Sequence, residues 1–420
     1  MSKHVQANPG TRKWQVWGVF LAVLSILAVL NTSIRLKAQN PPFDPKSDGS
    51  DKDLTITDPG VTYFDPKARN LNPKGDNIFN FTTITIAAGS TLKLSEAKLH
   101  GPVYFLAQGD VTINGNIDLS GDDSKGPTPT AAEQSLTFAG SGGYAGGLGG
   151  IHNDANHQAL PGNGPGTAAA GDINNSANYA VGGSFSTNRF LVPLVGGSGG
   201  GGTNDNGQYG AQGGAGGGAL LIASSGKITL DGKDGNNGFI KALGGSGGER
   251  GCGGSGGAVR LVANSIIGAN NYIIWVHSQG GNACKVGPAT GLVRLESNNT
   301  QFGSDHVSNY QAVYSVPFAL NLPTVPPPVI YVASIDGTPI NANPFGFPDK
   351  TINTASPVLV VINATNVPIA SQVTLYLISD VQPNQAIPVK LTGDDRSSTA
   401  TVHVTFPPGG SRGFVKAVFQ

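Results

Sequence analysis

The sequence predicts an all-β protein in which a right-handed parallel β-helix, or solenoid-like repeat domain, precedes an Ig-like β-sandwich. Three observations support this fold class. The 420 residues include 62 glycines and 28 prolines but only 12% charged residues, a composition that disfavours helix. Short runs of alternating apolar residues end repeatedly in turn-forming residues. One such phrase recurs along the chain at the spacing that is typical of stacked repeats.

The N-terminal residues 1–38 are predicted to be a signal peptide or a membrane anchor. Basic residues precede a mostly apolar run from Trp14 to Leu30, and a polar stretch follows it. The most apolar part of this run gives roughly 21 Å of helix, which is short for a membrane span. Cleavage near Ala38 is therefore favoured over an anchor retained at residues 14–30. The mature chain is expected to be extracellular or in the cell envelope.

The charge balance argues against nucleic acid as a partner. The chain has 26 basic and 26 acidic residues, so it carries no electrostatic footprint for nucleic acid or for an anionic membrane surface. We expect membrane contact only through an uncleaved N-terminal segment. No cofactor is predicted.

Residues 39–78 are expected to form an extended polar leader. The segment is rich in proline, aspartate, lysine and asparagine and has few paired apolar positions. Little of it is therefore expected to be buried.

Residues 79–322 are predicted to form a glycine-rich β-repeat domain. Copies of one phrase begin at Gly101, Gly218, Gly257 and Gly291, and the last three start at nearly even intervals. Each copy predicts a strand, a tight turn and a second strand, and the few polar residues in the second and third copies indicate burial on both faces. One copy cannot bury its own apolar face, so neighbouring copies are expected to stack. An antiparallel β-sandwich is the alternative.

A low-complexity insert at residues 121–217 interrupts these repeats. The chain from Gly140 to Gly257 holds 39 of the 62 glycines. Such density predicts either a flexible linker or close main-chain packing of the polyproline II or collagen type, where glycine alone fits. Scattered large apolar residues in the insert favour a partly ordered flap.

The C-terminal part is predicted to be a separate module. A proline linker at residues 323–328 ends the repeat domain. Residues 329–420 hold six or seven alternating runs separated by turn residues, which favours an Ig-like β-sandwich.

Two groups of phrases carry a resemblance to known proteins. GGSGGAVRLVA and GGAGGGALLIASSGKITLDG resemble the glycine-rich repeat modules of many large secreted proteins of soil and environmental bacteria. PVLVVINATNVPIASQVTLYLI resembles the Ig-like or fibronectin-like modules appended to them, and together the two regions cover about two thirds of the chain. The resemblance implies an envelope or extracellular protein, although this chain has few copies and a long insert.

Cys252 and Cys284 are predicted to form a disulfide. They lie in similar glycine-rich surroundings, and their separation in the sequence is close to the repeat length. Stacked copies would bring their Cα atoms to about 4.4–6.8 Å. An exported chain also meets an oxidising compartment. Two unpaired small residues are the alternative.

Candidates for catalysis and metal binding are weak. The adjacent carboxylates Asp122 and Asp123 follow a predicted strand, but turn preference explains them without catalysis or calcium binding. His152, Asp154 and His157 lie close together in a segment that is predicted to be a loop, where a metal would lack an ordered scaffold.

Other patterns are interpreted as structural. Ser198, Ser246 and Ser255 match G-x-S-x-G only inside GGSGG, and no helix is predicted to follow them. Arg260 and Arg294 occupy equivalent positions in successive copies and are expected to face solvent.

These observations favour a non-enzymatic exported structural or adhesion protein of the cell surface or extracellular space. The alternatives are a β-helix carbohydrate-active enzyme, such as a polysaccharide lyase or glycosidase, and a carbohydrate-binding protein without turnover. Expected partners are extracellular polysaccharide or other cell-surface proteins.

Overall fold

The structure is a computed structural model that describes residues 42–71, 74–129, 137–166, 168–232, 238–280, 284–307, 312–340, 350–379, 383–406 and 413–419. Almost all of these residues belong to one compact unit, Phe43–Gln420. The predicted signal peptide or anchor at residues 1–38 lies outside the described residues. Within the described ranges, no helix is long and apolar enough to cross a membrane.

The described chain is all-β, as predicted. Its helical elements are two short 3₁₀ turns, η2 (Ser176–Asn178) and η3 (Ser304–His306), and all its other regular elements are strands. The high glycine and proline content explains this, because both residues destabilise helix interiors.

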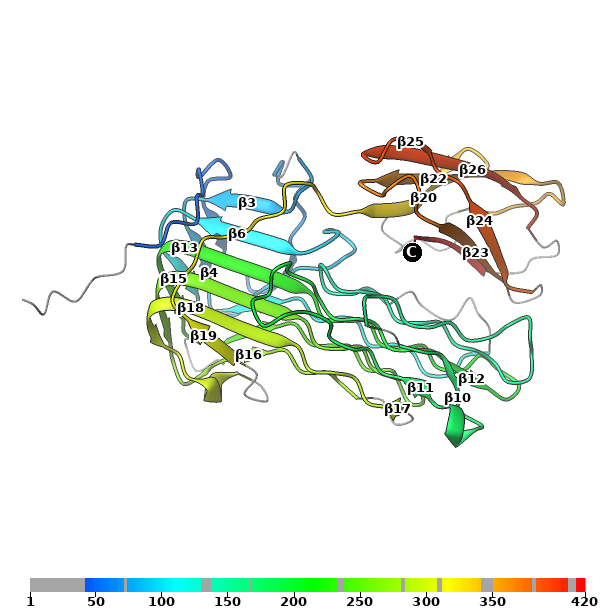
Figure 1. Cartoon of the computed structure of the whole chain (residues 1–420), viewed down its shortest axis with the longest axis horizontal. Helices are drawn as coiled ribbons and strands as arrows, with labels where there is room; N and C mark the ends of the chain where they lie inside the picture. Colours follow the sequence, from blue (N-terminus) through cyan, green and yellow to red (C-terminus); the bar gives the residue numbers. More distant parts are fainter. Residues whose placement is uncertain are drawn as a thin grey trace, which may run out of the picture. The chain divides into compact units, whose positions relative to one another are not determined.

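Two parallel sheets form the repeat domain. The first contains β1 (Leu54–Ile56), β3 (Ile78–Phe81), β4 (Ile84–Ile86), β6 (Val103–Ala107), β7 (Val111–Ile113), β13 (Ala219–Leu230), β15 (Ala258–Gly268), β18 (Leu292–Gln301) and β19 (Ala312–Ser315). The second contains β2 (Gly60–Tyr63), β5 (Ser90–Lys93), β8 (Asn116–Asp118), β14 (Gly238–Lys241) and β16 (Tyr272–Trp275). In both sheets the paired strands follow one another in chain order, as β3, β6, β13, β15, β18 and β19 of the first sheet show in Figure 1.

The predicted repeat copies pair with one another in the register that the sequence indicates. Val103 lies beside Leu220, Leu220 beside Val259, and Val259 beside Val293. All of these pairings are parallel, so the antiparallel alternative for this region is wrong. The predicted two-sided burial is also confirmed, because the first six residues of β13 and of β15 are all buried.

A hydrophobic core lies between the two sheets. Inward side chains of the second sheet, such as Ile117, Ile240 and Ile274, belong to the same buried cluster as Val259 and Leu261 of the first. Each stacked strand therefore covers the apolar edge of its neighbour, which one copy alone could not do.

The expectation of an unburied leader at residues 39–78 is wrong. β1 pairs with β4 and β2 pairs with β5, so this segment supplies the first strand of each sheet. Leu54, Ile56 and Phe64 are at most 3% exposed. Each strand is only three or four residues long and has polar residues on both sides. The alternating pattern was therefore too short to predict these strands from the sequence.

The described residues of the low-complexity insert are ordered by main-chain packing, so the flexible-linker alternative is wrong, and they are more ordered than the partly ordered flap that the sequence favoured. We define the glycine-rich region as residues 137–166, 168–218, 244–257, 276–280 and 284–291. Its segments extend beyond the first sheet as adjacent chains, which Figure 1 shows leading toward β10, β11, β12 and β17. They are joined by main-chain hydrogen bonds such as Gly197 N–H to Gly217 O (2.7 Å) and Gly213 N–H to Gly147 O (2.8 Å).

The spacing between these chains leaves no room for side chains. A Cβ atom on Gly216 would lie 1.8 Å from Gly197 O, and one on Gly291 would lie 1.8 Å from Gly257 O. The sequence-based alternative of close packing, in which only glycine fits, is therefore the correct one for this region.

Part of the insert covers the outer face of the first sheet. Leu191 and Leu194 pack in one buried cluster with Tyr104, Leu221 and Val262, whose side chains point away from the main core. This cover explains why the long strands of the first sheet are buried on both faces.

The C-terminal part consists of two antiparallel sheets. One contains β20 (Val329–Ile335), β21 (Thr338–Pro339), β22 (Val358–Thr365), β25 (Thr392–Gly393) and β26 (Ser397–Val404); the other contains β23 (Val373–Ser379), β24 (Gln385–Val389) and β27 (Gly413–Phe419). Val360, Ile362 and Leu375 are fully buried in a core shared by both sheets. The predicted runs therefore do form strands.

Candidate functional site

Three short parallel strands bring the most chemically varied side chains of the repeat domain together. β12 (Thr203–Asp205) lies between β9 (Gly150–Ile151) and β10 (Gly171–Asp172). The register sets Ile151 beside Asp205 and Asp172 beside Asn204. A polar turn follows each strand, so turns separated in the sequence meet at one place. We call these three turns, residues 151–158, 172–175 and 205–208, together with residues 249–250, whose Arg250 pairs with Asp205, the polar end.

Two histidine–aspartate pairs lie in the polar end. His152 Nδ1 is hydrogen-bonded to the carboxylate of Asp172, and His157 Nδ1 lies 2.6 Å from Asp154 Oδ2. The hydrogen bond from His157 lowers the pKa of Asp154. Burial acts to raise the pKa of Asp172, but the hydrogen bonds from His152 and Asn174 together outweigh it, so this pKa is also lowered.

The predicted grouping of His152, Asp154 and His157 is thus divided between two pairs. Asp172, which was not predicted from the sequence, is the hydrogen-bond partner of His152, whereas Asp154 pairs with His157. Among the described residues, no three His, Cys, Asp or Glu side chains are placed to hold a metal ion.

A third pair joins the polar end to the last glycine-rich segments. Arg250 Nη1 lies 3.2 Å from Asp205 Oδ2, and the side chain of Asp205 is largely buried. Gln208 Nε2 donates to the same oxygen at 3.3 Å. Sequence reasoning also missed this pair, because the only signal was a polar TNDN turn within a glycine-rich stretch.

Asp122 and Asp123 each bind main-chain N–H groups. Asp122 Oδ2 accepts from Phe138 N–H at 3.2 Å, and Asp123 Oδ1 accepts from Ser246 N–H at 2.6 Å. Partial burial raises the pKa of Asp122. The two carboxylates thus hold different neighbouring segments, as expected for turn residues.

The three serines of the GGSGG matches make structural hydrogen bonds. Ser255 Oγ accepts from Ser198 N–H at 2.9 Å, Ser198 Oγ accepts from Gly166 N–H at 3.0 Å, and Ser246 Oγ donates to Gly280 O at 3.2 Å. Ser198 and Ser255 are fully buried, so neither is accessible to a substrate in this structure.

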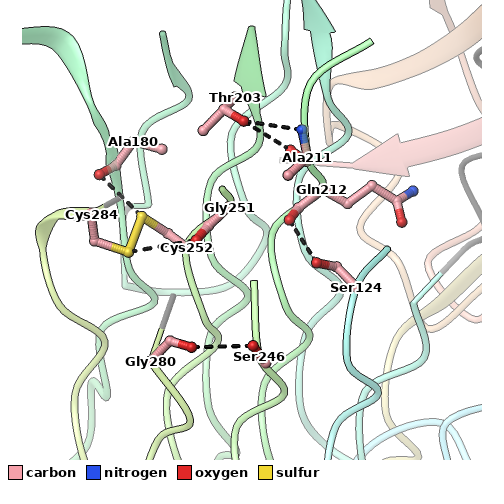
Figure 2. Close-up of a disulfide and its surroundings, with 10 residues drawn as sticks. All are labelled: Ser124, Ala180, Thr203, Ala211, Gln212, Ser246, Gly251, Cys252, Gly280 and Cys284. Atoms are coloured by element: carbon pink, nitrogen blue, oxygen red, sulfur yellow. Dashed lines mark hydrogen bonds between the residues drawn. A yellow bond between two sulfur atoms is a disulfide. The ribbon is translucent and has the colours of Figure 1, made fainter. Parts of the chain in front are cut away.

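The predicted disulfide between Cys252 and Cys284 is present. The Cα atoms are 5.4 Å apart, inside the predicted range. Figure 2 shows the bond between two glycine-rich chains, with Cys252 Sγ 3.2 Å from Ala180 O. Cys284 begins β17 (Cys284–Val286), which pairs in parallel with β11 (Ala180–Val181). The bond therefore ties consecutive excursions of the repeat domain.

The expectation that Arg260 and Arg294 face solvent is wrong. They are 1% and 3% exposed, and the Nε atom of each lies within 2.8 Å of Glu296 Oε1. Both point away from the main core, as the alternation predicts. Phe318 covers both guanidinium groups, 4.6 and 5.2 Å from its ring centre, so this outer face is buried. Glu296 neutralises only one of the two charges.

No family model matches this chain, and no curated protein and no solved structure matches it either.

Proposed function

We propose that this chain is an exported, non-enzymatic structural or adhesion protein of the cell surface or extracellular matrix. In this proposal a right-handed parallel β-helix with a glycine-packed extension is a rigid scaffold, and an Ig-like module is appended to it. We also propose that the chain belongs to the secreted glycine-rich proteins that its sequence resembles.

The observation that carries the proposal is the main-chain packing of the glycine-rich region. Such packing fixes the positions of many extended chains but leaves few side chains for chemistry. The chain order of both parallel sheets supports the β-helix, because each turn of a coil would add one strand to each sheet. Two antiparallel sheets around a shared core support the Ig-like assignment.

The disulfide supports export, because disulfides persist mainly in oxidising compartments. The test is fractionation of cells that express the full chain, followed by non-reducing mass spectrometry. We expect the protein in the envelope or medium, with one linked cysteine peptide pair. Recovery from the cytoplasm with two alkylatable thiols would contradict the proposal.

A carbohydrate-active enzyme is the competing function, and the raised pKa of Asp122 is the observation that favours it. Purified protein is incubated with pectins, alginates and plant glucans. Turnover that is lost in both Asp122→Ala and Asp123→Ala would replace the proposed function by an enzyme. We expect no turnover, because each carboxylate already accepts a main-chain hydrogen bond.

A further inference from the structure

The outer face of the second sheet carries an unbroken row of five side chains across its strands. Tyr63 lies beside Lys93, Lys93 beside Asp118, Asp118 beside Lys241, and Lys241 beside Trp275. Neighbouring strands are about 4.8 Å apart, so these side chains form a ladder at that spacing. We call them the outer row.

The outer row is accessible to solvent. Tyr63 is 49% exposed, and the other four residues are partly exposed. A second row, two residues earlier in each strand, consists of Val61, Thr91, Asn116, Phe239 and Ile273. Val61 is 63% exposed and the others are partly exposed. The face is therefore broad and mixes aromatic, hydroxyl, amide and charged groups.

Two aromatic rings fix the ammonium group of Lys241. Its Nζ atom lies 4.7 Å from the ring centre of Phe239 and 4.9 Å from that of Trp275. The two ring centres are themselves 4.6 Å apart. Cation–π attraction to both rings thus holds a positive charge at a defined place on the sheet.

This charge lacks an acidic partner within the described chain. Asp118 is already paired with Lys93, whose Nζ lies 3.2 Å from Asp118 Oδ2. No carboxylate of the described residues lies within ion-pair distance of Lys241. The ammonium group has three N–H donors, and an anionic ligand would accept from them in charge-assisted hydrogen bonds.

We propose that this face binds an acidic polysaccharide, with a sugar carboxylate on Lys241 and the C–H face of a sugar ring against Trp275. The proposal rests on the proposed function, since an exported protein meets such polymers. A protein partner fits less well, because Lys93, Asp118 and Asn116 interrupt the apolar side chains, whereas interface cores are depleted in charge. Nucleic acid fits less well because its affinity comes from many phosphate contacts.

The experiment measures binding of the exported full chain to polygalacturonate by isothermal titration calorimetry. Fully methyl-esterified polygalacturonate is the matched ligand control, because it keeps the sugar backbone and removes the negative charges. The test variants are Lys241→Met, which keeps the length of the side chain, and Trp275→Ala. The matched control is Lys227→Met, since Lys227 is an exposed lysine on the first sheet, with its Nζ 3.7 Å from Asp110 Oδ2.

We expect wild type and Lys227→Met to bind polygalacturonate equally and more weakly as salt rises. Lys241→Met should lose about tenfold in affinity, as expected for one lost charge-assisted contact. Trp275→Ala should lose affinity while its circular dichroism and melting stay close to wild type. The esterified polymer should bind at least about tenfold more weakly than the acid form.

Several results would overturn the proposal: no binding by wild type, equal binding of the esterified polymer, equal losses in Lys241→Met and Lys227→Met, or the same Lys241 dependence with duplex DNA. Fractionation tests the proposed function separately. An exported protein that fails to bind the polymer refutes only this proposal, whereas a cytoplasmic location refutes the proposed function.

Discussion

Replacing Gly216 by alanine tests whether main-chain packing stabilises the glycine-rich region. The new Cβ atom would lie 1.8 Å from Gly197 O, whereas real Cβ contacts are essentially never shorter than 3.0 Å. The two chains must therefore move apart by more than an ångström before this contact reaches an ordinary length. Because the obstacle is main chain, a change of rotamer cannot relieve it.

The magnitude follows from the hydrogen bonds that this separation breaks. The chains of Gly216 and Gly197 are joined by hydrogen bonds from Gly197 N–H to Gly217 O at 2.7 Å and from Gly200 N–H to Gly214 O at 2.9 Å. Each buried group left without a partner costs about 1–3 kcal/mol. Alanine also stabilises the folded protein by about 0.4–1 kcal/mol, because it restricts the unfolded chain more than glycine does. With two such groups, the free energy of unfolding should therefore fall by about 1–5 kcal/mol.

Gly287→Ala is the matched control, because a Cβ atom there would meet nothing within 4 Å. It should leave stability unchanged or raise it by about 0.4–1 kcal/mol. Urea unfolding followed by tryptophan fluorescence is the assay, since Trp275 is the only tryptophan after residue 17 and lies in the repeat domain. Equal unfolding midpoints for Gly216→Ala and Gly287→Ala would refute the packing argument.

Three further predictions concern bonds and charges. Replacing Cys252 and Cys284 by serine should lower the free energy of unfolding by about 3–4 kcal/mol, and a reductant should then shift the wild-type urea midpoint but not that of the variant. Glu296→Gln should lower stability by about 3–5 kcal/mol, because two buried guanidinium groups lose their carboxylate; a midpoint equal to wild type in urea would refute this. The folded-state pKa of Asp154 is depressed, so its contribution to stability is present above its usual pKa of 3.8 and is lost as the pH falls through the lower folded value. Urea midpoints measured from pH 6 to pH 2 should therefore fall less steeply in Asp154→Asn than in wild type, and parallel curves would contradict the role of the His157 hydrogen bond.

The repeat register was predictable because it is a local property. Apolar residues that recur in the same phrase must all face the same core, and a slip by one residue would turn each of them to the opposite face. The copies at Gly218, Gly257 and Gly291 therefore pair in the structure as they align in the sequence. The short strands β1 and β2 offered too few alternating positions for the same reasoning.

Burial of the two arginines was not predictable, because it depends on distant segments. Alternation along β15 and β18 places Arg260 and Arg294 on the face opposite the main core. Phe190, which lies in the insert, and Phe318, which follows β19, then cover that face. Nothing in the local sequence indicates that a segment so far away in the chain supplies the cover. The partners Asp172 and Asp205 were missed for the same reason, since their strands meet only after the insert has packed.

The glycine-rich region also explains why the disulfide lies where it does. Glycine loses more backbone freedom on folding than any other residue, and a chain segment without side chains buries little apolar surface to compensate. Hydrogen bonds between main chains contribute only about 0.5–1.5 kcal/mol each. A cross-link that restricts the unfolded chain is therefore most useful in this region, where the apolar contribution is smallest. Cys252 and Cys284 join two excursions of the glycine-rich region rather than two strands of the well-packed sheets. We infer that loss of this bond should loosen the polar end before it affects the core between the sheets, and hydrogen exchange of the reduced protein would detect that order.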